Sequence, residues 1–208
     1  MNNKAKTIII VILCVIIAGA LGFSFYKICA DSASDEPNPN VTLVTTPEQS
    51  DFELHPEWGG SKAQYTDYGE NLAKGKITRS NGYVDGFGPA NATDGKVSTY
   101  WEGAAGKYPN EMVIDMGSVT EMGAAQIKLV PESIWGCRLQ EIEIQVSVDG
   151  ENYTTVYPKT MLTFDSAKTN SAYMPFTEAV SAQYVKVLFH SNNGAGGGQA
   201  SEIEVFAP

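Results

Sequence analysis

The chain has 208 residues and a formal net charge of −10, a length that suits one domain with an appendage. Three of its 14 basic residues and none of its 24 acidic ones lie before position 30, so the rest of the chain carries 11 basic against 24 acidic residues. Such an acidic body repels nucleic-acid phosphates and anionic lipid headgroups. The composition therefore disfavours nucleic acid as a partner and favours a calcium ion or a neutral ligand.

The amino terminus contains a segment long enough to cross a membrane. Thr7–Tyr26 is a run of twenty residues without a charge, which spans about 30 Å as a helix. Lys4 and Lys6 precede it, so the amino terminus is expected to stay cytoplasmic. We predict that residues 1–30 are a single-pass anchor and that the domain is extracellular. A cleaved signal peptide, which would release a secreted protein, is the alternative, although Ile28–Ala30 makes a poor cleavage site.

The next segment has the composition of a tether. Residues 31–69 combine prolines with acidic and small polar residues and show no lasting helical or strand period. Such segments stay disordered and extended by self-repulsion. Trp58, Tyr65 and Tyr68 are expected to pack onto the edge of the domain that follows.

Residues 70–208 show the pattern of an all-β domain. Short runs of alternating apolar residues are separated by turn signals. In the clearest run, Gln140–Val148, we predict that Ile142, Ile144, Val146 and Val148 share one face. Asp149-Gly150 then predicts a hairpin. The pattern indicates a sandwich or jelly roll, with further strands at Met112–Met116, Gly123–Val130, Tyr153–Tyr157, Ala172–Phe176, Gln183–His190 and Glu202–Phe206.

The three cysteines do not form an even framework. Cys137 is the single cysteine of the body, and no pair has metal-ligand spacing. A Cys29–Cys137 disulfide is one possibility. The favoured interpretation is that Cys137 is a small packed residue.

Five segments of residues 70–208 carry a family resemblance. They are, in order, NLAKGKITRS at 71–80, NATDGKVSTYWEG at 91–103, MVIDMG at 112–117, WGCRLQEIEIQVSVDGENY at 135–153 and QYVKVLFHSNNGAGGGQASEIEVF at 183–206. These segments resemble the coagulation factor 5/8 type C, or discoidin, domain, and in particular the bacterial members grouped as carbohydrate-binding module family 32. The resemblance implies an antiparallel β-sandwich jelly roll of the galactose-binding-domain type. This chain lacks the cysteines that bridge the two ends of many animal members.

The segment from Asp94 to Thr99 has the chemistry of a loop around a hard cation. Asp94 offers a carboxylate, Gly95 permits a sharp turn, and Thr99 offers a hydroxyl and a carbonyl. The alternative is a plain turn with solvated acids. The family resemblance implies a structural calcium site whose ligands come from Asn91, Asp94, Lys96, Thr99, Ser201 and Glu202.

Sugar sites combine an aromatic ring with a few planar polar groups. Loops expected at one end of the sandwich carry such residues, whereas the resemblance makes Trp101 a core residue. Alternatively, Trp135 is buried and Arg138 pairs with Glu141 on the surface. The predicted ligand-binding residues are Glu102, Trp135, Arg138, Asn192, Asn193 and Gln199.

The sequence predicts a binding protein rather than an enzyme. It contains no G-x-S-x-G, no H-E-x-x-H and no Cys-His pair. We therefore expect a non-catalytic carbohydrate-binding module that binds a polysaccharide or glycan. A protein-adhesion module is the alternative, and a lipid-inserting surface at Tyr83, Val84 and Phe87 is disfavoured by the acidic body.

Overall fold

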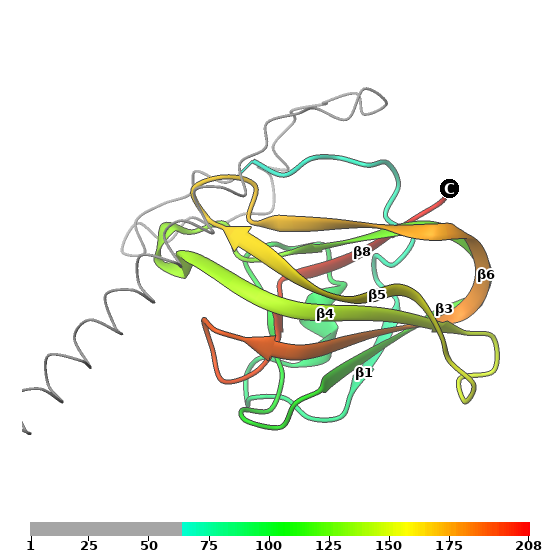
Figure 1. Cartoon of the computed structure of the whole chain (residues 1–208), viewed down its shortest axis with the longest axis horizontal. Helices are drawn as coiled ribbons and strands as arrows, with labels where there is room; N and C mark the ends of the chain where they lie inside the picture. Colours follow the sequence, from blue (N-terminus) through cyan, green and yellow to red (C-terminus); the bar gives the residue numbers. More distant parts are fainter. Residues whose placement is uncertain (1–63) are drawn as a thin grey trace, which may run out of the picture. The chain divides into compact units, whose positions relative to one another are not determined.

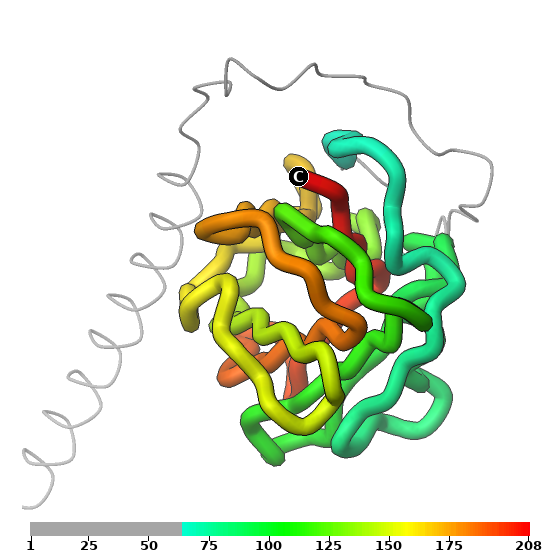
Figure 2. The backbone as a smooth tube through the Cα atoms, turned by 90° about the vertical axis from the view of Figure 1, so that its right-hand side faces the viewer, coloured from blue at the N-terminus to red at the C-terminus, as the bar shows by residue number. Residues whose placement is uncertain are grey.

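Two long strands, β3 (Asn110–Lys128) and β6 (Ser171–Asn192), form the centre of the fold in a computed structural model that describes residues 64–208 (Figure 1). They pair antiparallel almost throughout, with register shifts between Asp115 and Thr120 and between Met122 and Ala124. Register shifts arise where one strand has extra residues relative to its partner, and such bulges bend and twist a strand pair. The same two strands therefore contribute to both layers of a sandwich (Figure 2).

The remaining strands extend these two layers. The sheet order is β1-β3-β6-β4-β5, and β8 pairs with the second half of β3. A separate two-stranded sheet, β2-β7, pairs Trp101 with Ala200 and Glu102 with Gln199. The strand bounds are β1 Ile77–Ser80, β2 Trp101–Glu102, β4 Cys137–Ser147, β5 Thr154–Asp165, β7 Gln199–Ala200 and β8 Glu202–Phe206.

Helical structure is sparse in the described part of the chain. Residues 64–208 contain two 3-10 turns, η2 (Pro89–Ala92) and η3 (Ser133–Trp135), and no α-helix. No helix in this range is long and apolar enough to cross a membrane. The predicted anchor Thr7–Tyr26 lies outside the described residues, as does Trp58.

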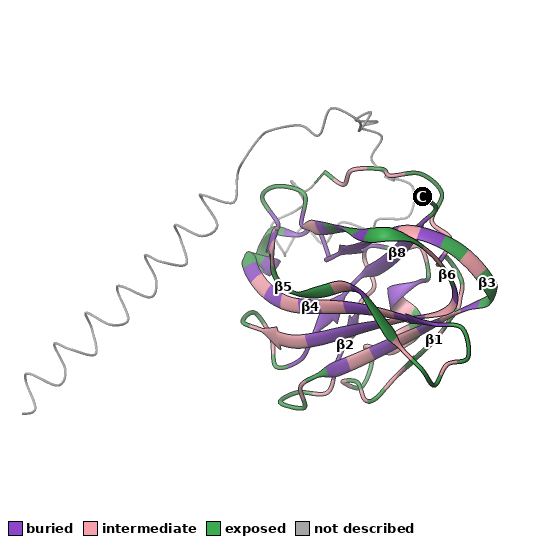
Figure 3. Cartoon of the chain, turned by 45° about the vertical axis from the view of Figure 1, so that its right-hand side comes forward, coloured by how far each residue is buried: buried purple, intermediate pink, exposed green. Residues whose placement is uncertain are grey.

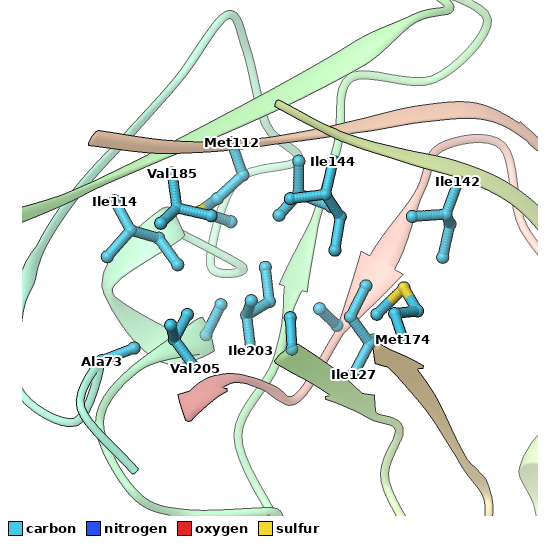
Figure 4. Packing of buried hydrophobic residues seen from close by; sticks show 14 of the residues in the cluster. Ala73, Met112, Ile114, Ile127, Ile142, Ile144, Met174, Val185, Ile203 and Val205 are labelled. Atoms are coloured by element: carbon cyan, nitrogen blue, oxygen red, sulfur yellow. The ribbon is translucent and has the colours of Figure 1, made fainter. Parts of the chain in front are cut away.

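The hydrophobic core lies between the two layers. Met112, Ile114, Ile144 and Val185 face Ile203 and its neighbours across the interior (Figure 4). Each of these five side chains is fully buried, and burying an aliphatic side chain of this size contributes roughly 1.5–3 kcal/mol. Exposed positions gather in loops, turns and outer faces (Figure 3).

The predicted all-β sandwich is therefore confirmed, with differences in detail. The expected strands 112–116 and 123–130 are parts of one strand, β3. The Asp149-Gly150 hairpin joins β4 to β5 as predicted. The placement of Val148 on the inward face is wrong, because β4 ends at Ser147 and the Val148 side chain is 58% exposed in the turn.

Residues just before the predicted domain contact it as expected. The Tyr65 hydroxyl donates to the Leu129 carbonyl at 2.5 Å, and the Tyr68 ring stacks on Tyr173 with 3.9 Å between ring centroids. The expectation of a small packed residue at Cys137 is wrong. Its side chain is exposed, and its thiol is disulfide-bonded.

Candidate functional site

An aromatic stack closes the end of the sandwich from which the predicted ligand-binding loops emerge. The Phe87 and Tyr100 rings stack with 4.3 Å between centroids, and Trp135 meets Tyr100 edge-on at 4.8 Å. The Arg138 guanidinium lies 4.5 Å from the centroid of the Trp135 ring. These contacts join the loop after β1, the segment before β2 and the η3 turn into one layer of side chains.

The prediction that Trp135 offers an exposed stacking face is wrong. The side chain is only 9% exposed and belongs to the hydrophobic core. Its indole is large enough to fill the space beneath the loops, where Tyr100 and Arg138 cover it. A smaller ring, that of Tyr83, remains accessible at this end. The Tyr83 side chain is 53% exposed, and its backbone forms an antiparallel β-bridge with Gly103.

A hydrogen-bonded chain of polar groups runs beside the aromatic stack. Arg138 is buried and donates from Nε to the Trp135 carbonyl at 3.1 Å and from Nη1 to Gln199 Oε1. Gln199 Nε2 in turn donates to Glu102 Oε2 at 2.9 Å. Burial lowers the pKa of Arg138, and the Glu102 carboxylate opposes that shift. Arg138 thus supports Gln199 and Glu102 from within and does not pair with Glu141.

The two predicted asparagines hold the loop that follows β6. Asn192 Nδ2 donates to the Gly197 carbonyl at 2.8 Å, and Asn193 Oδ1 accepts from the Leu139 backbone amide at 2.7 Å. Asn193 is exposed and Asn192 half-buried. The structure therefore brings all six predicted residues to one end of the domain.

Two buried amides that the sequence analysis did not name fix these loops in place. Gln140 Nε2 donates to the Gln199 carbonyl at 3.0 Å, and Gln140 Oε1 accepts from the Gln199 amide at 2.8 Å. Asn110 Nδ2 donates to the Ala104 carbonyl at 3.0 Å, and Asn110 Oδ1 accepts from the Gly198 amide at 2.8 Å. Gln140 lies in the inward phase of β4, and a polar residue at an inward position is the signal that could have identified it.

The predicted cation loop brings two carboxylates to one backbone amide. Lys96 N–H donates to Asp94 Oδ1 at 2.8 Å and to Glu202 Oε1 at 3.0 Å. Thr99 Oγ1 donates to Asp94 Oδ2 at 2.8 Å. Gly95 has φ +82°, and its N–H donates to Glu202 Oε1 at 2.9 Å. Its positive φ allows the tight turn that places both amides over Glu202.

The other two predicted calcium ligands use their side chains elsewhere. Asn91 Nδ2 donates to the Tyr100 carbonyl at 2.9 Å, and Ser201 Oγ donates to the Lys128 carbonyl at 3.0 Å. The resemblance described in the sequence analysis implies that their backbone carbonyls, and not their side chains, are the ligands. Within residues 64–208 no group of three or more His, Cys, Asp or Glu side chains is placed to hold a metal. A cation here would therefore depend on two carboxylates and on backbone oxygens.

Glu202 has the features of a carboxylate that lacks a counter-charge. Its side chain is almost fully buried, and no atom of residues 64–208 forms a hydrogen bond with its Oε2 atom. Burial, together with the adjacent Asp94 carboxylate, raises the pKa of Glu202 to about 9. A divalent cation would neutralise both carboxylates and supply a partner for the orphaned oxygen. The residues present fit a calcium ion.

Comparisons with known proteins identify the family of the domain and similar solved structures. The model of the F5/8 type C domain family matches residues 76–203. Chitosan-binding module 1 of a chitosanase/glucanase from Paenibacillus sp. IK-5 is 26% identical, with a TM-score of 0.55 over 67% of this chain and 100% of that one. Module 2 of the same enzyme, solved with chitotriose, is 26% identical, with a TM-score of 0.56 over 66% and 100%.

A third similar structure is a pectin-binding carbohydrate-binding module. It is 25% identical, with a TM-score of 0.53 over 63% of this chain and 89% of that one. No curated protein matches the chain by sequence.

The pKa of Glu202 predicts how the stability of the metal-free protein depends on pH. The folded-state pKa of about 9 exceeds the ordinary value of 4.5, so between these values the folded state holds a proton that the unfolded state has lost. The free energy of unfolding in chelator should therefore fall as the pH rises from 5 to 8, by at most about 1.4 kcal/mol per pH unit. Urea unfolding at several pH values measures this slope. Glu202→Gln should flatten it, and an unchanged slope in that variant would assign the dependence to another group.

Proposed function

Because the chain belongs to the F5/8 type C domain family, we propose that its β-sandwich is a non-catalytic carbohydrate-binding module that binds glycan chains at the loop end. The observation that carries the proposal is the supported carboxylate Glu102. Gln199 occupies one of its oxygens, and Gln199 is itself held by Arg138 and Gln140. A rigidly held acceptor loses little entropy when a sugar hydroxyl binds to it.

The ligand would lie over the half-buried and exposed residues of this end. Tyr83 supplies the exposed ring for the apolar face of a sugar. Glu102 and Asn193 supply polar groups at the rim, whereas Trp135, Arg138 and Gln199 are buried and act as supports. The ligand-binding site thus stays at the predicted end of the sandwich, but Trp135, Arg138 and Gln199 change from ligand-contacting to supporting residues.

A carboxylate acceptor suits ligands rich in hydrogen-bond donors. Among the described residues, the second oxygen of Glu102 has no donor, so it is available to hydroxyl or amino groups of a sugar. The similar modules from Paenibacillus sp. IK-5 are described as chitosan-binding. Glucosamine oligomers are therefore the first ligands to test, beside their N-acetylated and neutral counterparts.

We expect Glu102→Ala to weaken binding of a glucosamine trisaccharide about tenfold or more, because a hydrogen bond to a charged group contributes about 1.5–3 kcal/mol. Isothermal titration calorimetry measures the change from a wild-type dissociation constant near a millimolar. Glu121→Ala, an exposed acid on β3, is the matched control and should bind as the wild type does. A wild-type protein that binds no sugar on a broad glycan array but captures a protein partner would instead support the adhesion alternative.

We further propose that calcium occupies the loop of Asp94 and Glu202 and has a structural role. The ion would join the loop before β2 to the last strand, β8, and would replace the proton held by Glu202. The support is the buried, unpartnered Glu202 Oε2 beside a second carboxylate.

Calcium at a hundredfold excess over its dissociation constant should stabilise the folded state by about 2.7 kcal/mol. Thermal melts in chelator and then in calcium at constant pH measure this as a rise in Tm. Asp94→Ala should abolish the rise, whereas Asp85→Ala, a change at an exposed acid in the preceding loop, should leave it intact. An unchanged Tm in wild-type protein shown to start metal-free would exclude the site.

The proposed location is the outer face of the cell membrane, with residues 1–6 inside. The support is the uncharged Thr7–Tyr26 run behind Lys4 and Lys6. Protease treatment of intact cells should release a fragment that begins within residues 31–69. Release only from lysed cells would contradict this topology, and recovery of the intact domain from the medium would favour the secreted alternative.

A further inference from the structure

A second hollow lies away from the loop end, on the outer face of the larger layer. Its volume is about 550 Å³, within the range of small-molecule and cofactor sites. Strands β1, β3 and β6 form its floor, and the β4–β5 turn forms one wall. We call it the sheet-face groove; its lining is Arg79, Ser80, Asn81, Glu111, Val113, Asp149, Gly150, Glu151, Tyr153, Tyr184 and Lys186.

Strand register places the floor residues on one face. Arg79 is the Cα partner of Val113, and Val113 is the partner of Lys186, so the three form a row across β1, β3 and β6. Directly paired residues point to the same side of a sheet. Two residues further along, Asp115 and Tyr184 form the next row of that face. The intervening residues of these strands point into the core.

The wall of the groove is held rigidly. Asp149 accepts hydrogen bonds from Ser147 Oγ at 2.8 Å and from the backbone amides of Glu151 and Asn152 at 2.9 and 2.8 Å. Gly150 has φ +77°, and a Cβ there would lie 3.3 Å from the Tyr184 ring. The turn therefore rests directly on Tyr184, at a position where a larger residue would be both strained and crowded.

The second ring of the groove is fixed from below. Lys186 Nζ lies 3.6 Å from the centroid of the Tyr153 ring. Tyrosine rings held in this way offer apolar faces that lose little conformational entropy when a ligand binds. The groove thus combines two positioned aromatic side chains with hydrogen-bonding groups, which is the composition that sugar rings require.

The charges in the groove nearly cancel. Arg79 and Lys186 are cationic, Glu111 and Glu151 are anionic, and within residues 64–208 none of the four forms an ion pair. Asp149 is a third carboxylate of the lining, and its oxygens accept hydrogen bonds within the turn, so two cations face three carboxylates. Such a lining has no excess positive charge for a polyanion or an anionic lipid surface, and its mixed donors and acceptors suit a neutral ligand rich in hydroxyl groups.

We propose that the sheet-face groove is a second carbohydrate-binding site, which takes a neutral segment of a polysaccharide. It stands on residues separate from those of the loop end. Lys186 and Asn192 are six residues apart on β6, about 20 Å along the strand, and Asn81 at the near end of the groove lies two residues before Tyr83 of the loop end. A long chain can occupy both sites and gain avidity, whereas a trisaccharide occupies one at a time.

The test compares long and short ligands on the full chain, kept in solution with a neutral detergent. Affinity electrophoresis uses soluble β-glucan, galactomannan and arabinoxylan, with polygalacturonate as the anionic comparison. Calorimetry uses the trisaccharide that binds the loop end. Arg79→Ala combined with Tyr153→Ala should weaken retention by a neutral polysaccharide about tenfold and leave trisaccharide binding unchanged. Glu102→Ala should weaken trisaccharide binding and retain part of the polysaccharide binding.

A matched control changes an exposed cation and an exposed apolar residue at the edge of the same sheet. Lys159→Ala combined with Met161→Ala on β5 should bind as the wild type does. If the Tyr153 change prevents folding, Arg79→Glu repeats the test at an exposed side chain.

Three results would overturn the proposal. In the first, the groove variants bind neutral polysaccharide as tightly as the wild type does. In the second, the β5 control loses as much polysaccharide binding as the groove variants lose. In the third, the groove variants lose binding only of anionic polygalacturonate. Loss of trisaccharide binding in Glu102→Ala alone, with the groove variants unaffected, would leave the loop-end site standing without the groove. A wild-type protein that none of these sugars binds would overturn both sites.

Discussion

The pairing of β3 with β6 is the constraint on which the other features depend. These strands pass through both layers, and their register shifts let one continuous strand pair bend around the core. Their inward residues, such as Met112 and Val185, fill the space between the layers. Val113 and its paired residue Lys186 face outward and line the sheet-face groove. A slip of one residue would exchange these two sets, because side chains alternate along a strand. The core and the outer face are therefore fixed by one register.

At the loop end, buried polar side chains take the place of regular backbone pairing. The loops there have few strand partners, so their amides and carbonyls need other hydrogen bonds. The Gln140 side chain forms hydrogen bonds with both backbone groups of Gln199, as a neighbouring strand would. The Asn110 side chain likewise accepts from the Gly198 amide and donates to the Ala104 carbonyl. An unsatisfied buried polar group costs about 1–3 kcal/mol. These amides consequently stabilise the fold and the shape of the candidate site together.

Glu202 also joins two segments that lie far apart in the chain. Glu202 on β8 lies under the amides of Gly95 and Lys96, more than a hundred residues earlier in the chain. Without a cation the buried carboxylate retains a proton, and with one it would join the two segments directly. Binding of a small ion would then affect the stability of the whole sandwich, because β8 pairs with β3.

The sequence by itself determined the all-β class and the β4–β5 hairpin. Those features follow from local alternation and turn chemistry, which adjacent residues encode. The family resemblance added the set of residues expected at one end of the sandwich. The tertiary structure decided which side chains at that end are available. Trp135 and Arg138 look like surface residues when only their neighbours in the chain are considered, yet Tyr100 and Gln199 cover them. Burial is set by residues distant in sequence, and so are the clamps made by Gln140 and Asn110. The sheet-face groove is likewise a product of pairing, since Arg79, Lys186 and Tyr153 meet only when three strands and a turn are assembled.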